Sequence, residues 1–232
     1  MSGKRNIWEL LPSEDPKTIS EAEKILKDYF SALLKQGDKF FPGPKFAGSH
    51  FDTLDGGGER TEVANQITPS DLVAVTMLSV KVPHQTALKI LEQEAGRITE
   101  LLSQIPVSVD LVDVDFHDQR YSYMNPESGE AYELWRLLTS FHKIGWVIAG
   151  KLMARKRPRL IPVYDRVVRD EIIRVEGHKP DSYWQWLQDR LAKDDNALHR
   201  QLIQLKESSK IPESISPLRV FDVLVWKQGV GK

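Results

Sequence analysis

Apolar residues recur at helical spacing along most of this chain, a pattern that predicts a largely helical protein. Between residues 19 and 34 the apolar positions share one helix face, and Gly37 follows as a residue that ends helices. The run Thr68–Asp71 forms a helix start, with a capping side chain, a proline in the first turn and an acid three residues on. The helix that it opens extends to Val80 and is apolar on most sides, so we expect it to be buried. Further helices are expected at residues 84–103, 130–141, 146–156, 166–176, 181–193, 196–207 and 215–226.

Two segments lack this period. Residues 38–67 are rich in Phe, Pro and Gly and predict a loop with one or two short strands and a turn at Gly56–Gly58. Residues 105–118 predict a linker with some strand character. The expected fold class is therefore mainly α, a multi-helix globular protein with a small irregular or β segment near the N-terminus. We expect that segment at residues 1–67 and a helical domain at 68–232, with one continuous domain as the alternative.

The amino-acid composition excludes several kinds of functional site. The chain has 232 residues, 41% hydrophobic and 28% charged, which is typical of a globular protein. It contains no cysteine, which excludes disulfides, thiolate nucleophiles, cysteine-ligated zinc and iron–sulfur clusters. The first eight residues lack the apolar core of a signal peptide, and no apolar run is long enough to cross a bilayer. We therefore expect a cytoplasmic protein with no membrane partner, no cofactor and no metal.

Positive charge gathers in one stretch although the formal net charge of the chain is −1. Between Lys143 and Lys179 there are ten cations against four acids. This local excess favours a phosphate-binding patch. For Arg155–Arg157 taken alone, a solvated helix end is the alternative, because cations favour the C-terminal end of a helix dipole.

The run from Phe141 to Lys151 predicts a helix, a tight turn and a second helix. A helix N-terminus presents backbone N–H groups to a phosphate, and Gly145 permits its close approach. Asp165 follows at the start of the next helix, where a carboxylate can stabilise the positive charge that builds on a sugar when its glycosidic bond breaks. The alternatives are structural: Asp165 as a helix cap, Gly145 as an ordinary turn residue and Lys151 as an exposed helix residue.

Residues 130–170 resemble the helix-hairpin-helix element and catalytic Asp of the helix-hairpin-helix DNA glycosylase superfamily. Gly145 and Asp165 are twenty positions apart, which fits that pattern. His142 and Lys143 replace the proline and the first glycine of the hairpin, and Val147 stands where some members carry a Schiff-base lysine. The segment 145–168 also resembles an uncharacterised bacterial family of about this length.

What the resemblance implies is a monofunctional, cluster-free DNA glycosylase without lyase activity. It would flip a damaged or modified base and leave an abasic site. The near-neutral net charge argues separately against strong non-specific DNA binding, which extends the expectation to a rarer substrate such as a hypermodified base of phage DNA. The roles would belong to base excision repair or antiviral defence. Asp165 would be catalytic, and Lys143, Gly145, Lys151 and Arg155 would bind DNA. The alternatives are a non-catalytic helix-hairpin-helix DNA-binding protein and a structural protein in which the hairpin is only a helix turn.

Aromatic residues supply candidates for a pocket that takes the flipped base. They are Phe46, Phe51 and Asp52 in the irregular segment, together with Trp146 and Tyr164. For Trp146 and Tyr164 core packing is the preferred interpretation, whereas the irregular segment is the better candidate for contact with a ligand. The alternation of Asp113, Asp115 and His117 would place three metal-ligand side chains on one strand face, but the solvated face of an edge strand is the preferred interpretation.

Overall fold

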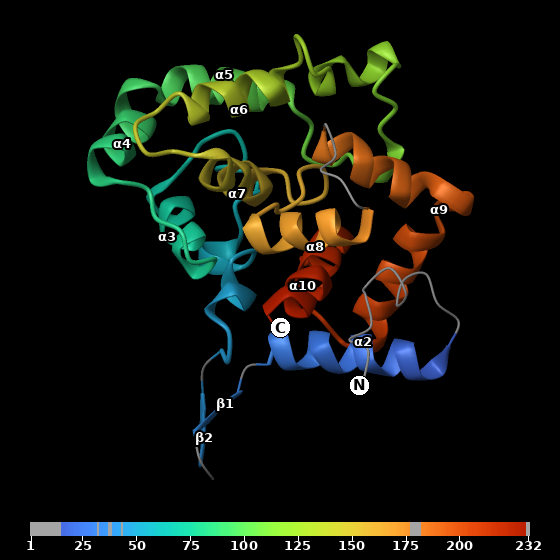
Figure 1. Cartoon of the computed structure of the whole chain (residues 1–232). Coiled ribbons are helices and arrows are strands. Elements are labelled where there is room, and N and C mark those ends of the chain that lie inside the picture. Colours follow the sequence, from blue (N-terminus) through green and yellow to red (C-terminus); the bar gives the residue numbers. More distant parts are fainter. Residues whose placement is uncertain (1–14, 32, 37–38, 43, 177–181, 231–232) are drawn as a thin grey trace. The chain divides into compact units, whose positions relative to one another are not determined.

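The computed structural model describes residues 15–31, 33–36, 39–42, 44–176 and 182–230. The chain is mainly helical, as expected (Figure 1). Its contacts divide it into a terminal unit, residues 1–49 with 164–232, and a central unit, residues 50–163. This division differs from the boundary expected between residues 67 and 68. The expected helix end at Gly37 and the first eight residues lie outside the described residues.

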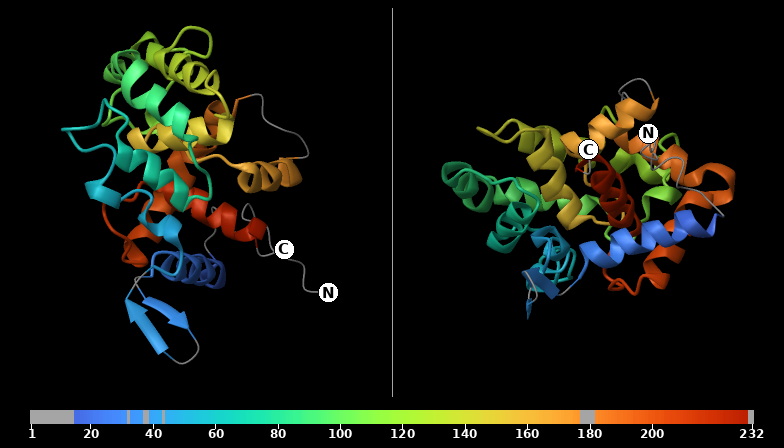
Figure 2. Two further views of the ribbon diagram at one scale, coloured as in Figure 1. Left: turned by 90° about the vertical axis from the view of Figure 1, so that its left-hand side faces the viewer. Right: turned by 60° about the horizontal axis from the view of Figure 1, so that its bottom comes forward.

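The terminal unit is built around its last helix. Its helices and strands are α2 (Pro16–Tyr29), β1 (Leu33–Gln36), β2 (Lys39–Pro42), the 3-10 turn Ala47–His50 at its edge, α8 (Arg166–Glu176), α9 (Tyr183–Ser208) and α10 (Pro217–Val230). Helix α10 contacts α2, α8 and α9, as the two views of Figure 2 also show. Its residues from Leu218 to Val225 are all buried. The core of this unit therefore surrounds α10, and chain segments from both ends of the sequence build it.

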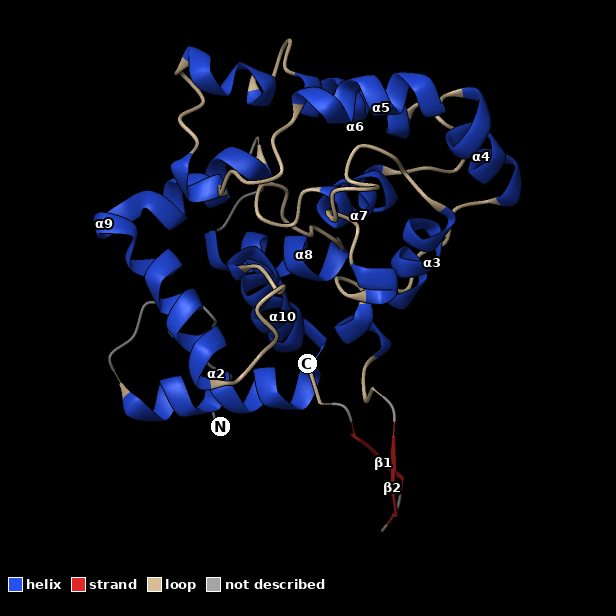
Figure 3. Cartoon of the chain, turned by 180° about the vertical axis from the view of Figure 1, so that it is seen from behind, coloured by secondary structure: helices blue, strands red, loops and turns tan. Residues whose placement is uncertain are grey.

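The helix expected over residues 19–34 ends earlier in the structure, where it is α2. Asp15 caps α2, its carboxylate accepting from the N–H of Lys17 at 3.3 Å and of Thr18 at 3.2 Å. The helix ends at Tyr29, and the chain continues into β1, which pairs with β2 in an antiparallel hairpin. The expected extension of the helix to residue 34 is wrong, because a short apolar run fits both the helical and the strand period. In Figure 3 the two strands extend away from the end of α2.

Helix α9 contains the interruption that the sequence indicates between residues 193 and 196. Asp194, Asp195 and Asn196 have φ values of 51°, 55° and 61°, so they leave the right-handed helical region. Two helical segments, on either side of this break, match the helices expected at 181–193 and 196–207.

The central unit is built around α7. Its elements are η2 (Leu54–Gly56), α3 (Pro69–Met77), α4 (His84–Leu88), a π-helical turn (Lys89–Gln93), α5 (Ala95–Gln104), η4 (Leu111–Asp113), η5 (Gln119–Met124), α6 (Glu130–Thr139) and α7 (Trp146–Lys156). Helix α7 packs against α3 and α6, and α6 packs against α5. Every residue from Ala149 to Lys156 is buried. Helix α7 thus occupies the core of this unit as α10 does in the other.

Two expectations for the central unit need correction. The helix expected over 84–103 consists of α4, the π-helical turn and α5 in succession. The segment 105–118 forms no strand in the part of the chain that the structure describes, and the 3-10 turn η4 stands there instead. The reason is tertiary, because the Leu111 N–H bonds the carbonyl of Arg159 at 3.0 Å rather than a neighbouring strand. None of the described helices combines the length and the apolar character needed to span a bilayer.

Candidate nucleic-acid site

The turn between α6 and α7 is fixed by two buried apolar side chains. Phe141 and Ile144 are each 4% exposed, and the Ile144 N–H bonds the Phe141 carbonyl at 3.0 Å. The hydroxyl of Thr86 on α4 donates to the carbonyl of His142 at 2.8 Å. The side chains of His142 and Lys143 are exposed between these anchors. The turn therefore presents a defined backbone shape with polar groups outside.

Lys143 adopts a backbone conformation that usually belongs to glycine. Its φ is +59°, in the left-handed region. A non-glycine residue there costs roughly 1–2 kcal/mol. Its side chain is exposed and forms no ion pair or hydrogen bond with the described residues. Lys143 is thus an exposed cation in a left-handed conformation, on a turn that buried side chains anchor.

Gly145 caps the N-terminus of α7 with φ −89° and ψ 175°, an extended conformation open to any residue. A Cβ atom added there would meet nothing within 4 Å. Its carbonyl accepts from the N–H groups of Ile148 and Ala149, both at 3.1 Å. Neither the backbone nor the neighbouring atoms require a glycine at this position. Glycine instead leaves open surface at the helix N-terminus, where a phosphate can approach.

Two of the expected DNA-binding residues lie in the interior. Lys151 is 2% exposed, and its Nζ donates to the carbonyl of Leu78 at 2.9 Å. Arg155 is also 2% exposed. Their partners belong to the same unit, so neither side chain reaches a phosphate at its surface. The expectation that Lys151 and Arg155 bind DNA is therefore corrected.

Arg155 and its neighbour share one buried carboxylate. The Nε of Arg155 lies 3.1 Å from Asp71 Oδ1, and Nζ of Lys156 lies 3.0 Å from Asp71 Oδ2. Arg155 also donates to the carbonyl oxygens of Phe51, at 2.6 Å, and Leu54. Burial lowers the pKa of Lys156, and the Asp71 carboxylate opposes that shift. This cluster is a structural ion network rather than a surface patch.

Arg157 has carbonyl partners instead of a carboxylate. Its guanidinium donates to Ile105 O at 2.7 Å, Ala64 O at 2.8 Å and Leu102 O at 2.5 Å, with Asn65 Oδ1 as a further acceptor at 2.8 Å. Burial lowers the pKa of Arg157 to about 10. The side chain joins the loop after η2 to the end of α5. Both interpretations offered for Arg155–Arg157, a phosphate patch and a solvated helix end, are thus wrong.

The turn at Gly56–Gly58 contributes to the packing around the end of α7. Gly56 and Gly57 have φ values of +74° and +91°. A Cβ atom on Gly58 would lie 2.4 Å from the carbonyl oxygen of Arg155. The turn lets the backbone approach α7. Glu59 follows it, half-buried, and burial raises the pKa of its carboxyl.

Asp165 belongs to the terminal unit and acts there as a helix cap. Its Oδ1 accepts a hydrogen bond from the backbone N–H of Val168 at 3.1 Å, and its backbone carbonyl accepts one from the backbone N–H of Arg169 at 2.9 Å. The side chain is half-buried. Asp165 therefore has the structural role of a helix cap. A cap also holds the carboxylate in one position, which a catalytic role requires.

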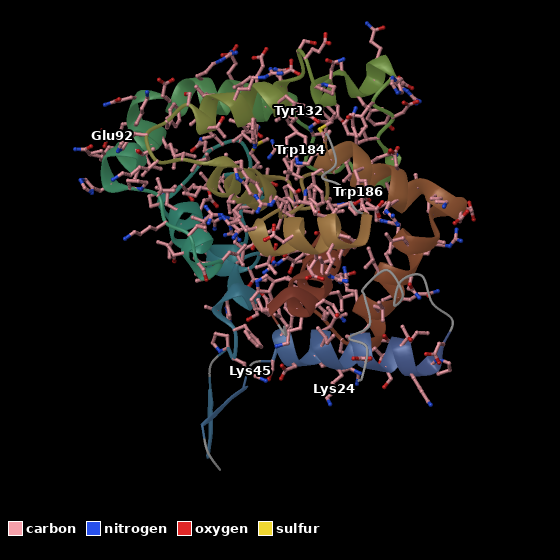
Figure 4. The ribbon with its side chains drawn as sticks, in the orientation of Figure 1. Lys24, Lys45, Glu92, Tyr132, Trp184 and Trp186 are labelled. Atoms are coloured by element: carbon pink, nitrogen blue, oxygen red, sulfur yellow. The ribbon has the colours of Figure 1, made fainter. Side chains whose placement is uncertain are left out.

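Beside Asp165 stands a stack of aromatic rings that sequence reasoning did not connect with it. The rings of Tyr164 and Tyr183 are 3.9 Å apart at 13°, and those of Tyr183 and Trp186 are 5.9 Å apart at 21°. Trp186 lies on the first turns of α9 (Figure 4). Burial raises the pKa of Tyr164 to about 12 and that of Tyr183 well above its usual range. Tyr183 follows the α9 cap Ser182, and that helix-start signal alone gives no hint of its position near Asp165.

The other residues expected to line a pocket for the base belong to two different units. Phe51 is fully buried in the core of the central unit, so it is corrected from a pocket residue to a packing residue. Asp52 and Trp146 are half-buried in the same unit. Phe46 belongs to the terminal unit, where its ring stacks on Tyr29 at 5.3 Å.

The surroundings of Phe46 are aromatic and basic. Trp226 meets its ring edge-on at 6.1 Å, and Nζ of Lys227 lies 4.7 Å from the ring centroid. Lys45, labelled in Figure 4, forms an ion pair with Asp28 of α2. Phe46 thus belongs to a cluster that packs the N-terminal helix against α10.

The residues weighed as metal ligands do not form a site. Asp113, Asp115 and His117 are exposed, and the His117 N–H bonds Asp115 Oδ1 at 2.9 Å. Among the described residues no group of three metal-binding side chains is gathered. The strand that would have aligned them is absent from this described segment.

The described residues form a mainly helical protein in which an exposed turn joins α6 to α7, and Asp165 caps α8. The chain belongs to a family of unknown function, DUF6308, whose model matches residues 22–229. A search of the curated proteins and of the solved structures found no match.

Proposed function

We propose that this protein is a monofunctional DNA glycosylase that hydrolyses the N-glycosidic bond of a damaged or modified base and leaves an abasic site. The observation that carries the proposal is the turn at residues 140–145. It is anchored by buried side chains, strained at Lys143, and open at a glycine that the fold does not need. Asp165 supplies a fixed carboxylate twenty positions later. The resemblance to the helix-hairpin-helix glycosylases supports the combination.

In this proposal the carboxylate of Asp165 faces the sugar of the flipped nucleotide. The bond between C1′ and the base nitrogen breaks, and positive charge on the sugar is stabilised by the carboxylate. The departing base takes up a proton from solvent. A water molecule then forms the C1′–oxygen bond, its proton passes to Asp165, and Asp165 releases that proton to solvent. Val147, the second residue of α7, offers no amine. The reaction therefore forms no imine with that residue and cuts no strand.

Fewer cations are available to bind phosphate than the charge of the sequence indicates. Of the cations between residues 143 and 174, Lys143 and Arg166 are exposed and form no ion pair or hydrogen bond with the described residues. We propose Lys143 and Gly145 as backbone contacts, and we add Arg166, the neighbour of Asp165. Few phosphate contacts predict modest non-specific affinity with a shallow salt dependence.

A charged probe tests the role of Asp165 without knowledge of the base. Duplex DNA with a protonated pyrrolidine in place of one sugar mimics the charge that develops in the transition state, and a neutral tetrahydrofuran abasic site is its control. We expect the pyrrolidine duplex to bind more tightly by about tenfold or more, which corresponds to 1.4 kcal/mol. Asp165→Asn keeps a good helix cap and should abolish this preference. Asp170→Asn, which changes an exposed acid on the same helix, should retain it.

The alternative is a non-catalytic DNA-binding protein, and the capping bond of Asp165 favours it. In that case Asp165→Asn leaves the affinity for both duplexes unchanged, while substitutions at Lys143 weaken both equally. Absence of any salt-dependent DNA binding would instead refute both proposals and leave the turn as a fold element.

A further inference from the structure

The hydroxyl of Tyr183 is a buried polar group with no hydrogen-bond partner among the described residues. The residue is 7% exposed, at the first position of α9. Nearly all buried polar groups in folded proteins are hydrogen-bonded, either to protein or to ordered water. An unpartnered hydroxyl lowers stability, and phenylalanine would fill the same volume without that cost. The group therefore calls for a ligand or a water molecule as its partner.

The position of Tyr183 relates this hydroxyl to Asp165. Its ring stacks at 3.9 Å on Tyr164, the residue that immediately precedes Asp165. Burial is the main cause that raises the pKa of Tyr183, and the charges of Asp222, Tyr164 and Asp165 add to it. The phenol therefore stays protonated at neutral pH and is available as a hydrogen-bond donor, and Asp222 and Asp165 are the carboxylates whose charges act on it.

We infer that the Tyr183 hydroxyl and the Asp165 carboxylate together hold the water molecule that attacks the sugar. This inference rests on the proposed function and assigns it a positioning residue. The Tyr183 O–H donates to the water oxygen, and one water proton points to Asp165. That proton moves to Asp165 as the new C1′–oxygen bond forms, while Tyr183 keeps its own proton throughout. The second lone pair of the water stays free to attack.

Tyr183→Phe tests the role, and the chain supplies a matched control. Tyr123 on η5 is also a buried tyrosine, 8% exposed, whose hydroxyl has no partner among the described residues. Burial raises the pKa of Tyr123 to about 12, and the charged neighbour that adds to this is Tyr121 rather than a carboxylate. On DNA from which the wild type releases a base, we expect Tyr183→Phe to lower kcat by about tenfold or more. DNA affinity should stay unchanged, and Tyr123→Phe should keep kcat within about twofold of the wild type.

Equal kcat for Tyr183→Phe and the wild type would overturn the inference, as would an equal loss in the Tyr123→Phe control. A crystal structure of the full chain provides a second readout that needs no substrate. We expect an ordered water within hydrogen-bond distance of both Tyr183 Oη and the Asp165 carboxylate, and its loss in Tyr183→Phe. A hydroxyl with no water beside it contradicts the inference. A water there in a protein that releases no base would confirm the site and refute the glycosylase proposal separately.

Discussion

Asp71 should be the most sensitive charged residue of the central unit. Its side chain is 1% exposed and faces Arg155 and Lys156, so Asp71→Asn leaves two buried cations without their carboxylate. Removing one partner of a buried ion pair costs about 3–5 kcal/mol. Total stabilities of domains are about 5–15 kcal/mol, so the loss is a large share. The asparagine retains an oxygen for the capping contact with Thr68, and the change isolates the charge.

Urea denaturation followed by circular dichroism and tryptophan fluorescence measures this loss. Thr68→Ala removes the cap and spares the ion pairs, for an expected cost of about 1 kcal/mol. Glu100→Gln breaks an exposed pair with Arg97 on α5, and we expect no resolvable loss of stability from it. If Asp71→Asn costs no more than Glu100→Gln, the buried network does not contribute as described, and the account of α7 is wrong.

Two further predictions follow from the site. Because burial raises the pKa of Glu59, the stability that its protonated form contributes is present below the unfolded pKa and is lost as pH rises through the folded value. Glu59→Gln should therefore raise the urea concentration at the midpoint of unfolding at pH 7. The gain should vanish near and below pH 4.5, the ordinary pKa of a glutamate carboxyl. An unchanged midpoint at pH 7 would contradict this prediction. Lys143→Ala should weaken DNA binding and reduce the salt slope by about one, whereas Lys151→Met should leave the slope unchanged because Lys151 is buried. A salt titration of both variants decides this, and equal slopes would contradict the surface assigned to the turn.

Local signals in the sequence predicted much of the helical structure. The expected helices at 146–156 and 166–176 coincide with α7 and α8. The start at Thr68 is a capping box, with Thr68 and Asp71 each bonding the other's backbone. The interruption of α9 near residue 194 also lies where expected. In each case residues a few positions apart carry the information, so a single sequence suffices.

The cations at the end of α7 are buried by residues that lie far away in the sequence. Arg155, Lys156 and Arg157 look like a solvated helix end because the partners that bury them lie 52 to 104 residues away in the chain. The arrangement of α2 with α9 and α10 is likewise a contact between the two ends of the sequence. The spacing of apolar residues along the sequence does not identify partners so far apart. This is why the basic run predicted a DNA surface and the structure instead has an internal ion network.

The candidate site was predicted in part. The turn and its exposed residues, Lys143 and Gly145, lie where the sequence placed them, and Asp165 has the capping position that was weighed for it. Tyr183 was missed because its local sequence signals only a helix start after Ser182 and nothing about Asp165. Its relation to Asp165 comes from the stacking of two rings nineteen positions apart in the chain.

Base release tests the central claim most directly. Duplexes carrying a panel of damaged and phage-type modified bases are incubated with the wild type, Asp165→Asn and Asp170→Asn, and abasic sites are revealed by alkali. We predict alkali-labile sites with the wild type and with Asp170→Asn, no cleavage before alkali, and none of these sites with folded, DNA-bound Asp165→Asn. Equal release by Asp165→Asn would contradict the role of this carboxylate, and release by none of the three proteins would contradict glycosylase activity on every base in the panel.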